Sequence, residues 1–201
     1  MATTHEQSDP RAHERSDPRA RMIDSAVTLF RERGVHGTSF SDVLEHSGAP
    51  RGSLYHWFPG GKAQLAEEAT RHAGEVIAAG LAAALDEKDP AAAVRGFARL
   101  YRGLLRRTDF AAGCPVVSAT LEGDRSPGAR DAAGAAFASW LDLLGSALER
   151  RGLEPERAQS IATLAIAAIE GGIVLARAER SLEPLERVAG EIETLVTAAV
   201  A

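Results

Sequence analysis

Residues 38–62 carry the pattern that most limits how this chain can fold, because they read as two short helices separated by a tight turn. Ser39 is placed to cap the first helix by accepting a hydrogen bond from an amide of its first turn. Gly48 stands where a left-handed residue would end that helix. Pro50 suits the first turn of the next helix, since its missing N–H would have no helical partner there. The pattern predicts a helix-turn-helix whose second helix ends near Trp57.

The exposed face of that second helix carries side chains that suit DNA. Arg51 can fork onto O6 and N7 of guanine, whereas the hydroxyls of Ser53 and Tyr55 suit phosphate oxygens. His56 can serve in either role, and Lys62 would place an ammonium group beside free amides at the start of a further helix. The predicted DNA-contacting residues are Thr38, Ser39, Pro50, Arg51, Gly52, Ser53, Tyr55, His56 and Lys62.

Several of these positions have plain structural alternatives. Arg51 can be a solvated cation at a helix end, Tyr55 can lie partly buried against the first helix, and His56 can be a surface or turn residue. The next two rings, Trp57 and Phe58, are assigned to the core because they share the apolar face of the helix.

The run from Arg21 to Leu65 resembles the DNA-binding domain of the TetR family of transcriptional repressors. The residues that carry the resemblance are Ile23 to Phe30, Gly34, Gly37, Thr38, Leu44 to Gly48, Gly52 to Phe58 and Lys62. The segment from Gly48 to His56, the Phe-Pro-Gly-Gly-Lys run that ends at Lys62, and Gly113 to Val116 are similar to the LmrA-like subgroup. The resemblance implies an all-α homodimer that represses from an operator in double-stranded DNA and is released by a small hydrophobic or aromatic effector.

Composition agrees with an intracellular DNA-binding protein. The net charge of -5 argues against indiscriminate nucleic-acid binding. Between Arg19 and Lys62, however, six cations and four acids give +2, so the remainder totals -7. The single cysteine, Cys114, excludes an intramolecular disulfide and suits a reducing cytoplasm. The longest nearly apolar run, Ile161 to Ile169, is shorter than the roughly 20 residues of a membrane span, and no membrane partner is expected.

Helical periodicity and stop signals predict about nine helices in three regions. Residues 1–16 are expected to be a disordered tail, 17–62 a three-helix DNA-binding domain, and 63–201 a helical bundle for ligand binding and dimerisation. A long helix from Lys62 to about Leu85 would join the DNA-binding domain to the bundle.

The last two predicted helices are expected to form a dimer interface. The helix that opens at Glu154 and Pro155 is apolar nearly all round, so it needs cover on more than one side. The final helix carries a seam of apolar residues at three- and four-residue spacing. Packing within one chain is the alternative. The predicted interface residues are Ile161, Leu164, Ala165, Ala168, Gly172, Leu185, Val188, Ile192 and Leu195.

The middle of the chain concentrates most of the bundle's aromatic residues and its thiol. The predicted effector-binding residues are Phe97, Tyr101, Phe110, Cys114, Phe137 and Trp140. Each of them could equally fill the core.

An enzyme is not expected. Cys114 has no histidine or acid beside it in sequence to activate a nucleophile, the six histidines lack metal-ligand spacing, and no cofactor loop is visible. No catalytic residue, metal or cofactor is therefore predicted. The remaining alternative is a dimeric helical scaffold or ligand-binding protein that does not bind an operator.

Overall fold

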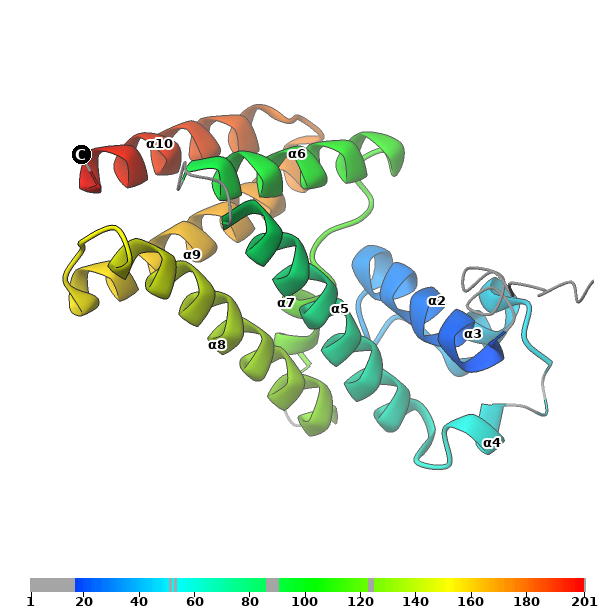
Figure 1. Ribbon diagram of the computed structural model, residues 1–201. Helices are drawn as coiled ribbons and strands as arrows, with labels where there is room; N and C mark the ends of the chain where they lie inside the picture. The colour runs from blue at the N-terminus through cyan, green and yellow to red at the C-terminus, as the bar shows by residue number, and fades with distance from the viewer. Residues whose placement is uncertain (1–16, 51, 53, 86–90, 123–124, 201) are drawn as a thin grey trace, which may run out of the picture.

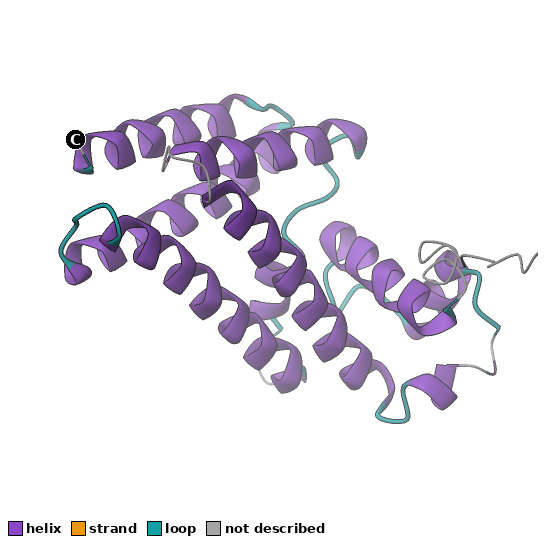
Figure 2. Cartoon of the chain, viewed as in Figure 1, coloured by secondary structure: helices purple, strands orange, loops and turns teal. Residues whose placement is uncertain are grey.

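The computed structural model describes residues 17–50, 52, 54–85, 91–122 and 125–200. Within these residues the chain forms nine α-helices, labelled α2 to α10, and no strand (Figures 1 and 2). The predicted all-α fold class is confirmed. The expectations for the 1–16 tail and for the side chains of Arg51 and Ser53 lie outside the described residues.

Helix α2 (Pro18–Arg33) begins and ends at residues whose chemistry favours helix ends. The Asp17 side chain caps it by accepting a hydrogen bond from the amide of Arg19 at 2.9 Å, and Pro18 occupies the first turn. Gly34 ends it at a φ of 76°. The apolar face of α2, which includes Met22, is buried, and α2 packs against α3, α5 and α7.

Helix α3 (Phe40–Ser47) is fixed at both ends by local hydrogen bonds. The Ser39 hydroxyl accepts from the Asp42 amide at 3.1 Å, and the Asp42 carboxylate accepts from the Ser39 amide at 2.7 Å. These bonds lower the pKa of Asp42, because they favour the charged carboxylate. Gly48, in the left-handed region at a φ of 63°, ends the helix where the sequence predicts.

Replacing Ser39 with alanine is expected to lower the free energy of unfolding by about 1 kcal/mol, because the Asp42 amide loses the hydroxyl that accepts its hydrogen bond. Thermal denaturation monitored by circular dichroism measures the loss. Replacing Ser41 with alanine is the matched control, since Ser41 is exposed and does not cap the helix. Equal stability of the Ser39 variant and the wild type would contradict the prediction.

Helix α4 (Leu54–Trp57) is shorter than predicted. The sequence suggested a helix from Pro50 to Trp57, but Pro50 lies outside any helix and Gly52 lies in a 3₁₀ turn. Glycine loses more backbone entropy in a helix than other residues, and a helix of one turn gains little by itself. The single turn of α4 therefore depends on the packing of the aromatic residues at its end.

Six helices of different lengths form the body. They are α5 (Gly61–Leu85), α6 (Ala91–Arg107), α7 (Pro115–Thr120), α8 (Pro127–Glu149), α9 (Pro155–Glu179) and α10 (Glu183–Ala199). Figure 1 shows α5 running from the α2–α4 unit into the body, where it packs along α8. The boundary proposed between residues 62 and 63 falls within α5, so this helix is shared by both regions.

The contact between α5 and α8 is close because one position is glycine. A Cβ added to Gly74 would lie 2.5 Å from the Cβ of Ala136, which is a severe overlap. The indole N–H of Trp140 in α8 donates to the carbonyl oxygen of Gly74 at 3.0 Å. This buried bond satisfies the polar end of a fully packed ring and fixes the position of α8 along α5.

Helix α9 is longer and more apolar than the run Ile161 to Ile169 suggests. By length and composition alone it could cross a membrane, but 44% of its most apolar window is buried inside the protein. The central helix of a soluble bundle has the same properties.

Candidate nucleic-acid interface and effector cavity

Tyr55 is the most prominent side chain of the recognition segment, which we define as residues 54–58. The side chain of Tyr55 is 71% exposed, although it is a large aromatic group. The ring contacts Phe40 of α3 edge to face, with centroids 6.1 Å apart and an interplanar angle of 82°. This contact orients the phenol without burying its hydroxyl, as a DNA contact requires.

Along the rest of the recognition segment the side chains change from exposed to buried. His56 is exposed and lies edge to face with Trp57, at a centroid distance of 4.8 Å. Trp57 is half-buried against the core and Phe58 is completely buried. The assignment of Phe58 to the core is confirmed, and Trp57 lies at the core's margin.

The two predicted DNA-contacting residues that precede α3, Thr38 and Ser39, differ in how exposed they are. Ser39 is exposed, but its hydroxyl is engaged in the capping box. Thr38 is only 1% exposed, and its hydroxyl donates to the carbonyl oxygen of Gly34 at 2.9 Å. In this conformation the Thr38 hydroxyl stabilises the turn between α2 and α3. Its contact with phosphate remains a prediction that needs this turn to shift.

Lys62, Pro50 and Gly52 border the recognition segment. Lys62 is the second residue of α5, and its ammonium group donates to the carbonyl oxygen of His36 at 3.2 Å. Pro50 and Gly52 are both exposed on the approach to α4. A Cβ added to Gly52 would meet no atom within 4 Å, so space does not require glycine at this position.

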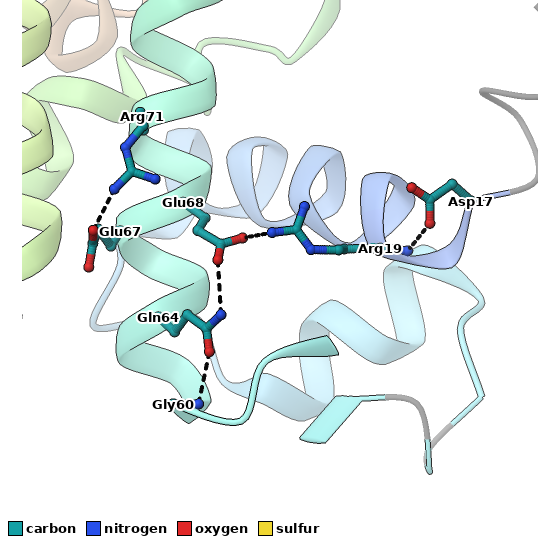
Figure 3. A network of polar contacts seen from close by, with 7 residues as sticks. All are labelled: Asp17, Arg19, Gly60, Gln64, Glu67, Glu68 and Arg71. Atoms are coloured by element: carbon teal, nitrogen blue, oxygen red, sulfur yellow. Dashed lines mark hydrogen bonds and ion pairs between the residues drawn. The ribbon is translucent and has the colours of Figure 1, made fainter. Parts of the chain in front are cut away.

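A polar network joins α2, α5 and the turn that follows the recognition segment (Figure 3). Arg19 of α2 forms an ion pair with Glu68 of α5, and its guanidinium group lies 5.5 Å from the centre of the Phe58 ring. Gln64 donates to Glu68 at 2.9 Å and accepts from the amide of Gly60 at 2.8 Å. The turn after α4 is thereby bonded to the same face of α5 that Arg19 contacts.

Two hydrogen bonds donated by backbone amides join the DNA-binding unit directly to the body. The amide of Gly113, just before α7, donates to the carbonyl oxygen of Arg31 at 2.8 Å. The amide of His36 donates to the buried carboxylate of Glu122 at 2.9 Å. Any displacement of the segment before α7 would therefore act on the last turn of α2.

A cavity of about 40 Å³ lies between α5, α6, α8 and α9. Its lining is apolar except for one acid. The lining residues are Ile77, Leu81, Ala93, Val94, Phe97, Trp140, Leu144, Ala165, Ile166, Ile169 and Glu170.

Two of the six predicted effector residues, Phe97 and Trp140, line this cavity. Tyr101 and Phe137 stand behind them, since Tyr101 packs on Phe97 at 4.9 Å and Phe137 on Trp140 at 5.0 Å. Phe110 lies at the turn after α6, at a left-handed φ of 63°.

Glu170 is the functional candidate that the sequence analysis missed. It is 8% exposed, and among the described residues its carboxylate has no nitrogen or oxygen donor; the weak thiol donor of Cys114 lies beside it. Burial raises its pKa to about 7, although the adjacent Cys114 thiol partly opposes the shift. A signal was present in the sequence, because Glu170 is the only charged residue between Ile161 and Ala176.

Cys114 is buried and unreactive in character. Burial, together with the nearby Glu170 carboxylate, raises the pKa of its thiol to about 12. Almost no thiolate is then present at neutral pH, so a nucleophilic role is not supported. Among the described residues, no group of three or more His, Cys, Asp or Glu side chains could hold a metal ion.

Comparison with known proteins identifies the family. The profile for bacterial regulatory proteins of the tetR family matches residues 22–69, and the profile for the C-terminal domain of LmrA/YxaF-like transcriptional regulators matches residues 90–191. The HTH-type transcriptional regulator Rv0196 of Mycobacterium tuberculosis is 44% identical over 184 residues, which cover 89% of this chain and 93% of that protein. The chain belongs to the TetR family of transcriptional regulators.

Other relatives agree with this TetR-family assignment. The HTH-type transcriptional regulator LmrA of Bacillus subtilis is 32% identical over 178 residues, covering 88% of this chain and 95% of LmrA. A TetR transcriptional regulator from Chloroflexus aurantiacus has a TM-score of 0.75 and 26% identity, covering 92% of this chain and 96% of that one. TetR-family proteins are DNA-binding regulators and not enzymes, and the predicted LmrA-like resemblance is confirmed.

The predicted dimer residues of this TetR-family chain divide between its interior and its surface. Ile161, Ala165, Gly172, Leu185 and Ile192 are buried within the chain itself. Gly172 shows why, because a Cβ there would lie 3.3 Å from the Cα of Leu185, so α9 and α10 already pack closely on each other. Ala168, Val188 and Leu195 are half-buried, and Leu164 is 51% exposed. The side of α9 that remains free carries Leu164 together with Val174 and Leu175.

Proposed function

We propose that the chain is a homodimeric repressor that binds an approximately palindromic operator and is released from it by a small hydrophobic or aromatic effector. The observation that supports this most directly is the exposed Tyr55 phenol on a recognition segment that ends in the completely buried Phe58, whose ring lies beside the Arg19 guanidinium group of α2. A reading surface needs a packed support, and the burial of Phe58 supplies one.

The proposed dimer uses the free side of α9. Leu164, Val174 and Leu175 are each about half exposed, on a helix whose other side is covered by the body. Large apolar side chains gathered on one helix suit association with a second copy. A symmetric dimer presents two recognition segments, so half-sites should repeat at about 34 to 36 Å or a multiple of that spacing.

The proposed release uses the cavity and its connection to α2. The cavity wall includes Glu170, and the Cys114 thiol lies beside that carboxylate. The next residue along the chain, Gly113, donates to the carbonyl oxygen of Arg31. A ligand that prefers a displaced arrangement of this segment by a few kcal/mol would be enough to shift the population away from operator binding.

Selection of bound duplexes from a random DNA pool, followed by anisotropy titration at two salt concentrations, tests operator binding. We expect a palindromic winner and a steep decrease in affinity with salt. Replacing Arg51 with alanine should weaken binding and relax specificity at one base position. Absence of enrichment over non-specific DNA would instead favour the alternative function, a dimeric helical scaffold or ligand-binding protein without an operator.

Replacing Tyr55 with alanine is expected to weaken operator binding by about 5- to 30-fold, which corresponds to about 1 to 2 kcal/mol for a contact to DNA. Stability should change little, because the side chain is 71% exposed. Replacing Tyr55 with phenylalanine separates the two possible sources of the effect, since it keeps the edge-to-face contact with Phe40 and removes only the hydroxyl. If both variants bind the selected operator like the wild type, Tyr55 does not contact DNA.

A further inference from the structure

The effector cavity contains one feature that an apolar ligand alone would not use. Ten of its eleven lining residues are apolar or aromatic, and the remaining one is Glu170. The residue is more than nine-tenths buried, and among the described residues the only donor beside its carboxylate is the weak thiol of Cys114. Burying a carboxylate with so weak a partner is costly, so its presence in an otherwise apolar wall calls for a function.

The surroundings of Glu170 supply no cation. From α5 and α8 it faces apolar side chains and Trp140, whose N–H is already donated to Gly74. From α6 and the segment before α7 it faces Tyr101 and Cys114, and burial raises the pKa of both groups, so both are neutral at physiological pH. Arg31 of α2 acts on Tyr101, but no cation contributes to the pKa shift of Glu170.

We propose that Glu170 is the recognition group for a small aromatic or apolar molecule that carries a single ammonium group. This inference rests on the effector site proposed above and names the chemistry of its ligand. The cavity of about 40 Å³ is smaller than the roughly 150 Å³ in which benzene binds, so α6 and α9 would have to separate for the apolar walls to hold the ring. The ammonium group would then donate to the two carboxylate oxygens. A charged donor forms the stronger hydrogen bond to a carboxylate, and the low dielectric of the cavity strengthens the attraction.

The ionisation of Glu170 gives this proposal a specific signature. Its pKa of about 7 means that the carboxylate is largely neutral at pH 6 and largely charged at pH 8. Only the charged form attracts an ammonium group. The affinity for a ligand that stays protonated should therefore increase from pH 6 to pH 8, by up to about tenfold, because ligand binding is linked to loss of one proton.

Three probes of similar shape test the proposal: benzylammonium, benzyl alcohol and toluene. Their binding to the full-length protein at pH 8 can be followed by calorimetry and by the fluorescence of Trp140, which lines the cavity. We expect benzylammonium to bind at least about tenfold more tightly than toluene. Replacing Glu170 with glutamine should weaken benzylammonium binding about 30-fold while toluene binding changes less than about twofold. The matched control is Glu179→Gln, which removes the same charge from an exposed position of α9.

The outcomes separate this inference from the proposed function. Equal binding of toluene and benzylammonium, or unchanged benzylammonium binding by the Glu170→Gln variant, would overturn the ammonium preference and leave an apolar effector cavity. Binding of none of the three probes would overturn the inference and also argue against the cavity as the effector site. Operator affinity of the ligand-free protein, measured by anisotropy, tests the repressor function independently of all three probes.

Discussion

Replacing Phe58 with alanine is expected to lower the free energy of unfolding by about 3 to 5 kcal/mol and to abolish operator binding. The ring is completely buried, and the guanidinium group of Arg19 lies 5.5 Å from its centre. Removing it leaves a cavity between α2 and α5 at the point where the recognition segment ends. The single turn of α4 has too few hydrogen bonds of its own to persist without that support.

Two measurements are needed for the Phe58 variant, because loss of stability and loss of DNA binding have different controls. Chemical denaturation gives the change in unfolding free energy, and the Phe58→Leu variant should recover most of it by refilling the space. Leu100→Ala, at an exposed position of α6, is the control for removing a large apolar side chain. Wild-type operator affinity in the Phe58→Ala variant would show that the recognition segment does not depend on this anchor.

The helices of the DNA-binding unit could be predicted because their signals are local. Asp17, Ser39 and Gly48 act within a few residues of their own positions, and each stands in the structure where its chemistry places it. The length of α4 could not be predicted in the same way. Pro50 is compatible with a helix start, but whether a helix forms there depends on the balance between glycine entropy and tertiary packing.

The residues of the body were harder to assign because burial in a bundle depends on three-dimensional packing. The apolar character of α9 suggested a partner, yet much of that surface is covered by α10 and the body of the same chain. Periodicity cannot distinguish an intrachain neighbour from a second subunit. The aromatic cluster was predicted as a cavity wall, but only Phe97 and Trp140 face the cavity.

Glu170 shows a different limitation of prediction from sequence. Sequence reasoning concentrated on aromatic residues as ligand contacts and passed over one acid in an apolar helix. Its importance depends on burial in an apolar wall with no cation beside it, and that is a property of the packed structure. The sequence does separate Glu170 from the exposed Glu179 of α9, since Glu179 stands among arginines and Glu170 among apolar residues, but it does not show what packs against the carboxylate.

The stability of the wild-type protein is expected to fall as the pH rises from 5 to 8, and Glu170→Gln should remove about 2 to 3 kcal/mol of that decrease. The ordinary pKa of this carboxyl is 4.5, and burial raises it to about 7 in the folded protein. Between these values the unfolded chain releases a proton that the folded chain retains. The group therefore disfavours folding progressively as the pH rises through this window, and above about pH 7 its full cost is present.

The local surroundings make this prediction specific to one group. Cys114, with a pKa of about 12, and Tyr101, with a pKa raised well above 10.0, stay neutral between pH 5 and pH 8. Urea denaturation of both proteins at several pH values and one fixed protein concentration measures the difference, and titrations elsewhere cancel in the comparison. The Glu179→Gln variant should follow the wild type. Parallel pH profiles for the wild type and Glu170→Gln would mean that the pKa of Glu170 in the folded protein is close to its ordinary value. The cost of burying its charge would then be offset by an ion or molecule bound from solution.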